Sequence, residues 1–231
     1  MENTMKRCCI IMALGIAVAL GEPLPSQEKK PGVVVDKDAK TVTIDVKIAP
    51  RVVIKEKKEP YPLEVIACWP YPKGKKAHET IVTIDESIKP SEIAKALESL
   101  GLKAGKPVKG EGDPQGPAVN IYFIVPDPTG LDRKVTLDRA MIDSKNGKPF
   151  PKNVESRYTG SILVQPDPNK NEKVYGADFS GTLMSIFPVT DETVFQTSLK
   201  IEQEGIMKLE VNPKTMPKEG TPVKLVIEIK K

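Results

Sequence analysis

Alternation of apolar and polar residues marks two long segments of the chain. In Thr41–Ile48 every second residue is valine or isoleucine, and the residues between are threonine, aspartate or lysine. Residues 222–229 show the same alternation, interrupted by Val226. A period of two is typical of a strand with one buried face. An Asp/Lys-rich turn precedes Thr41–Ile48 and predicts a hairpin with the valines at 33–35.

Shorter apolar runs separated by turn residues predict further strands. They lie at 63–68, 80–84, 118–125, 133–138, 161–165, 173–179 and 182–187. Two of the turns between them, at 126–130 and 166–170, begin with Pro-Asp-Pro, which suits a reversal of the chain. Two more segments, 197–202 and 206–211, flank Gln-Glu-Gly at 203–205 and predict a C-terminal hairpin.

One segment has the pattern of a helix. Pro90 stands in its first turn and Gly101 just past its end, the positions these residues favour. Ile93, Leu97 and Leu100 fall at spacings of three and four and form one apolar face. We therefore expect a strand-rich α+β fold. It would have mostly antiparallel sheet, this helix at about 90–100 on one face, and a C-terminal β-hairpin and strand extension.

The N-terminus resembles an export signal. MENTMKR is charged, CCIIMALGIAVALG is apolar, and the run ends in small residues. A helix of this length spans roughly 20 Å, short of the ~30 Å hydrocarbon core. We expect a cleaved signal peptide at 1–21 rather than a membrane anchor, which stays the alternative. The protein would then be exported, periplasmic or secreted, without stable membrane insertion.

The remaining chain divides by composition. Residues 22–32 are polar and proline-rich, which predicts a disordered leader. The main domain would follow at 33–190. Residues 191–231 would form a C-terminal β extension packed on the same domain.

Charge and aromatic content argue against nucleic-acid binding. The chain has 35 basic and 31 acidic residues, a formal net charge of +4. Removing 1–21 takes away Lys6, Arg7 and Glu2, which leaves 33 against 30, or +3. Aromatic residues are only 5%, whereas nucleic-acid binders pair a basic stripe with stacking aromatics.

Segment 68–79 concentrates the unusual side chains. It holds the only tryptophan, Trp69, the only histidine, His78, and the only cysteine outside the first ten residues, Cys68. We expect it to join two antiparallel strands as a hairpin, with Cys68 ending the first strand and His78 beginning the second. Cys68 and His78 are then candidate catalytic residues, because a thiol nucleophile needs a base within hydrogen-bond reach. A packed, inert thiol is the alternative.

The same loop is a candidate binding surface. Trp69, Tyr71, His78 and Glu79 would contact a partner, because aromatic residues are common anchors at interfaces. Inward packing of Trp69 is the alternative. His78 and Glu79 are weak metal candidates, because zinc sites generally require more nitrogen or sulfur ligands than the chain supplies. No phosphate-binding glycine loop or Gly-x-Ser-x-Gly motif occurs, and we expect no cofactor.

Two groups of motifs resemble the YdjY domain family of bacterial exported proteins. The first comprises Ile66-Ala67-Cys68, Gly74, His78-Glu79-Thr80 and the helix with Leu100-Gly101-Leu102. The second comprises Tyr158-Thr159-Gly160-Ser161, Tyr175-Gly176-Ala177-Asp178 and Ser180-Gly181. The likeness covers roughly 33–190. It departs from the family at 155–157, where Glu-Ser-Arg replaces the favoured tryptophan.

The resemblance implies export and a shared fold, without an established activity. The ferredoxin-like label of some members has no support here, because an iron–sulfur cluster needs several thiolates. We therefore expect an exported envelope protein that acts as a non-catalytic binding or structural module. Its 68–79 loop would contact an unknown envelope protein or ligand. A thiol enzyme or redox protein, or a metal-binding domain, are the alternatives.

Overall fold

The computed structural model describes residues 32–127 and 129–230. The expected signal peptide and all but the last residue of the expected leader lie outside these ranges. The first strands are β1 (Val33–Asp36), β2 (Thr41–Ile48), β3 (Val53–Ile54), β4 (Glu59–Pro60), β5 (Val65–Cys68), β6 (Thr80–Ile84), β7 (Ala118–Pro126) and β8 (Asp132–Thr136). The later ones are β9 (Met141–Asp143), β10 (Lys148–Pro149), β11 (Ser156–Tyr158), β12 (Leu163–Val164), β13 (Val174–Tyr175), β14 (Thr182–Ser185), β15 (Phe195–Thr197), β16 (Leu209–Val211) and β17 (Pro222–Ile229). The helices are α1 (Pro90–Ser99), α2 (Leu137–Ala140), α3 (Gly176–Ser180) and α4 (Ile201–Ile206).

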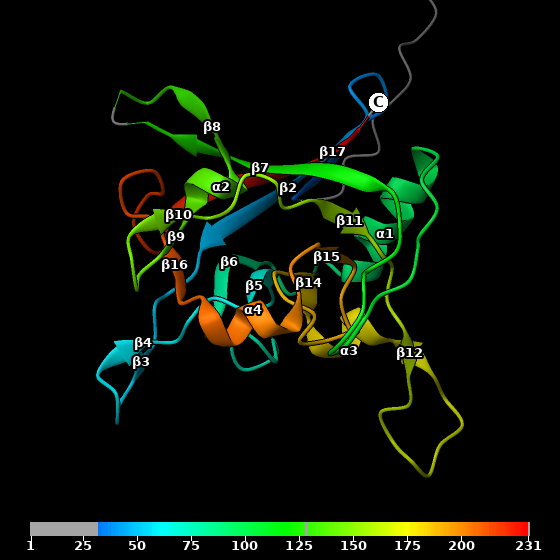
Figure 1. Cartoon of the computed structure of the whole chain (residues 1–231). Helices are drawn as coiled ribbons and strands as arrows, with labels where there is room; N and C mark the ends of the chain where they lie inside the picture. The colour runs from blue at the N-terminus through cyan, green and yellow to red at the C-terminus, as the bar shows by residue number, and fades with distance from the viewer. Residues whose placement is uncertain (1–31, 128, 231) are drawn as a thin grey trace, which may run out of the picture.

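Eight strands close into a barrel (Figure 1). Their order is β2-β17-β7-β11-β15-β14-β5-β6, and β6 pairs again with β2. The hairpin partners β1 and β8 lie beside this ring: β1 shares one edge of β2 with β6, and β8 shares one edge of β7 with β11. The protein is strand-rich, as expected, but the class is mostly β rather than α+β. Closure rests on the long-range pairings of β2 with β6 and with β17, which no local pattern encodes.

The alternating residues of the long strands fill the barrel. On β2, Ile44 is fully buried, and it faces Leu225 on β17, which in turn faces Phe123 on β7. All three side chains are at most 1% exposed. The polar residues between them face outward, because successive side chains of a strand point to opposite sides.

The predicted helix is confirmed as α1, and its apolar face is buried. Ile93 and Leu97 are fully enclosed in the core. The first turn is capped from elsewhere in the chain: the backbone N–H and hydroxyl of Ser91 donate to the carboxylate of Asp178 on α3, at 2.8 and 2.6 Å. The hydroxyl of Tyr158 on β11 donates to the carbonyl of Ala94 at 3.3 Å. These contacts fix α1 against both α3 and the barrel.

The expected antiparallel hairpin at 68–79 is wrong, because β5 and β6 are parallel. Val65 pairs with Thr80 and Cys68 with Thr83. Parallel neighbours need a crossover of about a dozen residues, and residues 69–79 supply it. Cys68 ends β5 at one end of the pair, whereas His78 precedes β6 at the other.

The expected C-terminal hairpin at 197–202 and 206–211 is also wrong. Residues 201–206 form α4, and the side-chain carbonyl of Gln203 accepts the N–H of Lys200 at its start. The strand that follows, β16, pairs with β9 instead. Residues 176–179, expected in the strand at 173–179, belong to α3. In both places a short helix with local hydrogen bonds replaced extended pairing.

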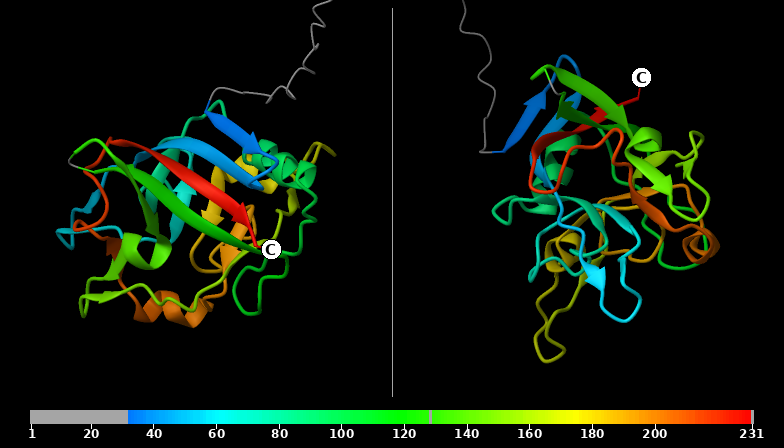
Figure 2. Two further views of the ribbon diagram at one scale, coloured as in Figure 1. Left: turned by 90° about the horizontal axis from the view of Figure 1, so that it is seen from above. Right: turned by 90° about the vertical axis from the view of Figure 1, so that its left-hand side faces the viewer.

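Strands late in the chain are integral to the barrel. β15 lies between β11 and β14, and β17 lies between β2 and β7. In the left view of Figure 2, β17 (red) lies between β2 (blue) and β7 (green). Among the residues that the structure describes, no helix has the length and apolar character needed to span a membrane.

Candidate functional site

The crossover loop, residues 69–79, is pinned to the corner between α3 and β14. The N–H of Trp69 donates to the carbonyl of Gly181 at 2.8 Å, and that of Lys75 donates to the carbonyl of Ser180 at 2.9 Å. Within the loop, the N–H of Gly74 donates to the carbonyl of Pro70 at 3.0 Å. A Cβ on Gly74 would lie 2.0 Å from the carbonyl oxygen of Trp69. The fold therefore requires glycine at this turn.

Trp69 is turned toward the protein interior. Its indole N–H donates to the carbonyl of Ile88 at 2.8 Å, and the ring packs against the core. A Cβ at Gly181 would lie 2.8 Å from the ring, so the backbone passes close beneath it. The ring is half-buried and its only donor is satisfied. Trp69 thus anchors the crossover loop.

The outer side of the loop carries a stack of three rings. The imidazole of His78 lies between the rings of Tyr61 and Tyr71, with centroid distances of 5.7 and 5.2 Å and interplanar angles of 27° and 26°. Tyr71 is 71% exposed. The loop places Tyr71 and His78, and the segment before β5 places Tyr61. No local pattern connects Tyr61 with the loop, because the contact between Tyr61 and His78 depends on the parallel crossover.

Arg51 holds the backbone of Tyr61, one of the two tyrosines in this stack. Its Nη2 donates to the carbonyl of Tyr61, and the same nitrogen lies 3.8 Å from a carboxylate oxygen of Glu210. Burial lowers the pKa of Arg51, against the opposing effect of nearby carboxylates. Its Nε and Nη1 are buried without a hydrogen-bond partner among the described residues. Arg51 was not among the expected site residues.

Cys68 lies in an enclosed, apolar setting. The residue is 0% exposed, and its sulfur is 3.9 Å from the hydroxyl of Thr182. Burial raises the pKa of the thiol, and this effect outweighs the hydrogen bonds to the sulfur. A raised pKa and a closed environment both reduce the thiolate needed for nucleophilic attack. The ring of His78 meanwhile contacts the two tyrosines, so the two candidate catalytic residues have separate surroundings.

Glu79 is half-buried beside the stack. Burial raises the pKa of its carboxyl group, opposed chiefly by the charge of Lys76. Lys76 itself forms an ion pair with Glu64. The carbonyl of Glu79 accepts the N–H groups of Glu64 and Val65 at 3.0 and 3.1 Å, which starts β6. The described residues include no group of three or more His, Cys, Asp or Glu side chains placed to hold a metal ion.

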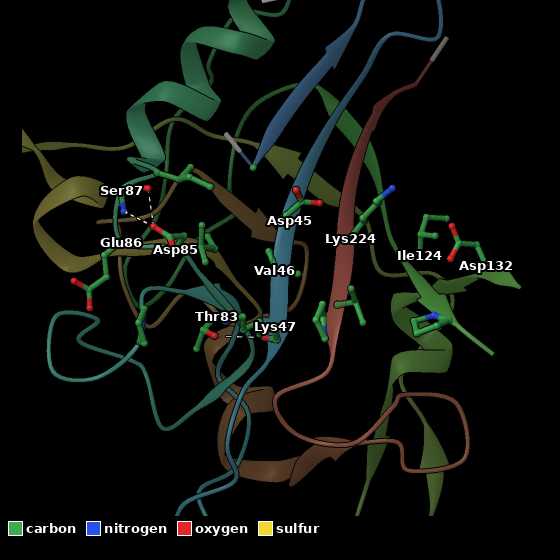
Figure 3. A pocket seen from close by; sticks show the side chains of 17 residues that line it. Asp45, Val46, Lys47, Thr83, Asp85, Glu86, Ser87, Ile124, Asp132 and Lys224 are labelled. Atoms are coloured by element: carbon green, nitrogen blue, oxygen red, sulfur yellow. Dashed lines mark hydrogen bonds between the residues drawn. The ribbon is translucent and has the colours of Figure 1, made fainter. Parts of the chain in front are cut away.

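A second feature is an open groove on the outer face of the barrel, with a volume of about 1030 Å³. Figure 3 shows Asp45 on β2, Lys224 on β17 and Ile124 on β7 lying next to one another across its floor. The strand register places these three in one row. Asp85 and Glu86 line the opposite end, at the turn after β6. The groove was not expected from the sequence.

These features define a mostly β barrel domain with exposed aromatic and polar surfaces and a shielded thiol. The chain belongs to the YdjY domain family, whose profile matches residues 33–228. The match extends past residue 190 to include β15, β16 and most of β17. No curated protein and no solved structure matches the chain.

Several residues that carried the family resemblance have structural roles. The hydroxyl of Thr159 donates to the carbonyl of Val194 at 3.1 Å. The hydroxyl of Ser161 accepts the N–H of Ala177 at 2.9 Å, at the start of α3. Asp178 caps α1, as described above. This group of residues joins α1, α3 and the barrel, which indicates that the shared motif preserves the fold.

Proposed function

We propose that this protein is a non-catalytic binding module of the bacterial envelope, and that the Tyr61–His78–Tyr71 stack is its contact surface. The observation that carries the proposal is the exposure of Tyr71 on a rigidly held loop. Aromatic rings that are fixed before binding lose little conformational entropy on contact, which makes them effective anchors. Export is supported by the N-terminal sequence pattern and by the resemblance to exported proteins.

The chemistry of the loop favours binding over catalysis. The thiol of Cys68 is buried with a raised pKa, and His78 stacks on tyrosines. A thiol enzyme needs an activated nucleophile next to its base. The stack instead presents flat rings and a tyrosine hydroxyl, which suit a protein surface with apolar and hydrogen-bonding groups.

The test is capture of partners from an envelope extract by chemical cross-linking to the purified protein. Tyr71→Ala should reduce the recovery of specific partners at least about tenfold, the effect of losing roughly 1.4 kcal/mol at an interface anchor. Leu163→Ala is the matched control, because Leu163 is similarly exposed, at 63%, on β12. If Tyr71→Ala and His78→Ala both retain every partner at wild-type level, the stack is not the contact surface.

Two further variants separate the alternatives. Cys68→Ala should leave partner capture unchanged, whereas a thiol enzyme or redox protein would lose its activity. Elemental analysis of the native protein and of His78→Ala addresses metal binding. A stoichiometric metal that disappears in His78→Ala would replace the present proposal with a metal-binding function.

A further inference from the structure

The outer groove holds four side chains of opposite charge near one end. Asp45 and Lys47 are exposed on β2, and Lys224 stands directly across from Asp45 on β17. Asp85 belongs to the turn after β6 and lines the same part of the groove (Figure 3). Residues directly opposite each other on neighbouring strands have Cβ atoms about 5 Å apart. Two carboxylates and two amines therefore share a small area, and their formal charges cancel.

These four charged groups are not paired with one another. Among the described residues none of the four forms an ion pair, whereas Glu86, next to Asp85, is 2.6 Å from Lys73. The hydroxyl and the backbone N–H of Ser87 donate to Oδ1 of Asp85 at 2.6 and 2.9 Å. These hydrogen bonds lower the pKa of Asp85, and the charge of Lys47 acts in the same direction. The carboxylate of Asp85 is therefore ionised at neutral pH, and Ser87 contacts only one of its two oxygens.

The groove continues from these charges over an apolar surface. Ile124 lies beside Lys224 on β7 and is partly exposed. Pro222 and Pro126 lie two residues further along the same two strands and are both exposed. The volume of the groove, about 1030 Å³, is at the upper end of the range for sites that bind small molecules. A ligand that fills the groove must combine a charged end with an apolar body.

The side chains of the groove limit the chemistry of that charged end. The described residues that line the groove include no aromatic ring. Quaternary ammonium groups bind in aromatic cages, whereas a primary ammonium group donates strong hydrogen bonds to carboxylates. Lysine side chains bind phosphate as point charges. The complementary group therefore carries a primary ammonium and a phosphate a short distance apart, and it has no net charge.

We propose that the groove binds the ethanolamine phosphate head group of a phospholipid. The ammonium group lies against Asp45 and Asp85, and the phosphate lies between Lys47 and Lys224. The two-carbon bridge of ethanolamine holds the two charges about one strand spacing apart, ~5 Å, which matches the separation of β2 and β17. The glycerol backbone and the start of the acyl chains cover the apolar end of the groove. Soluble ethanolamine phosphate would leave that end empty, so the lipid is the better fit.

The first test is titration of the ¹⁵N-labelled full chain with a monomeric short-chain phosphatidylethanolamine, followed by NMR of the backbone amides. Saturable shifts are expected at residues 45–47 and 222–224. Phosphatidylcholine of the same chain length should bind at least about tenfold more weakly, because its methylated ammonium cannot donate hydrogen bonds to the carboxylates. Phosphatidylglycerol, which lacks an ammonium group, should also bind more weakly. Equal affinity for the three lipids, absence of binding, or shifts confined to other residues would overturn the proposal.

Soluble O-phosphoethanolamine separates the head group from the rest of the lipid. It should shift the same amides with a lower affinity, because it does not cover the apolar end of the groove. An affinity equal to or higher than that of the short-chain lipid would overturn the assignment to a lipid and identify the soluble compound as the ligand.

The second test repeats the titration with variants of the groove. Asp45→Asn should weaken binding about five- to tenfold, because a charge-assisted hydrogen bond becomes a neutral one. Asp38→Asn is the matched control, because Asp38 is exposed in the turn between β1 and β2, outside the groove. Equal weakening by both variants, or by neither, contradicts the proposed site. Tyr71→Ala should leave lipid binding unchanged, because Tyr71 does not line the groove, so failure of this site and failure of the proposed contact surface are distinguishable.

Discussion

In the crossover loop some residues anchor the backbone, whereas others are exposed to solvent. Trp69 donates its indole N–H to the backbone and is half-buried, whereas Tyr71 is 71% exposed. Cys68 and Gly74 pack against each other: a Cβ at Gly74 would lie 2.8 Å from the sulfur. The inward residues fix the loop, and this fixes the orientation of the rings on its outer side.

At this scale we predict that the thiol of Cys68 is unreactive in the folded protein. Ellman's reagent at pH 8 should modify less than about a tenth of Cys68 in native protein and all of it in denaturant, because the raised pKa and burial both suppress the thiolate. Mass spectrometry of the peptide that contains Cys68 provides the measurement. Full native modification within minutes would contradict the buried setting.

The raised pKa of Cys68 also makes the free energy of unfolding depend on pH. The folded state keeps the Cys68 proton at a pH where the unfolded thiol, with a pKa of about 8.5, loses it. The unfolded state then binds fewer protons, so the free energy of unfolding falls as the pH rises above about 8.5. Chemical denaturation at pH 7 and pH 10 should show a smaller decrease for Cys68→Ala than for the wild type.

Among the elements, the crossover between β5 and β6 determines which residues meet at the candidate contact surface. A hairpin would have returned the chain antiparallel to β5, but the loop runs back along the strand pair and starts β6 parallel to it. This path places His78 next to Tyr61. It depends on the close turn at Gly74, where the backbone leaves no room for a side chain.

Gly74→Ala should therefore destabilise the protein by at least about 2 kcal/mol, since its Cβ would collide with rigid backbone. Gly205→Ala is the control. Gly205 lies exposed in α4 with open space around the Cβ position, and alanine there should add about 0.5–1 kcal/mol of stability. Denaturant titration of both variants measures the difference. A tolerated Gly74→Ala would show that the turn can relax.

The whole molecule depends on β17, the last strand of the chain. It pairs with β2 along seven positions and with β7 along six. Its inward residues Val223, Leu225 and Ile227 are at most 5% exposed. β17 thus joins the beginning of the chain to its middle and completes the closed ring.

Removal of residues 222–231 should abolish cooperative folding, because it opens the barrel and exposes two long strand edges. Removal of residues 230–231 alone is the control and should change stability by less than about 1 kcal/mol. Circular dichroism during thermal unfolding provides the measurement. A cooperative transition in the longer truncation would show that the remaining strands close without β17.

Local patterns along the chain were enough to predict the strands that have one buried face and the position of the long helix. Alternation in β2 and β17 and the proline and glycine at the ends of α1 are local signals, and they depend on nearest neighbours along the chain. The resemblance to the YdjY domain family also came from short motifs. The strands and the helix follow from backbone geometry and from the burial of one face, so a single sequence is sufficient to predict them.

The pairing of strands and the set of residues at the candidate site follow from long-range contacts instead. The parallel pairing of β5 with β6 and the placement of β17 between β2 and β7 each depend on which distant segment best fills an available strand edge. Packing across the whole core determines which segment pairs with each strand edge. Tyr61, Arg51 and the outer groove consequently join the candidate surfaces through contacts between residues far apart in the chain, which have no counterpart in local periodicity.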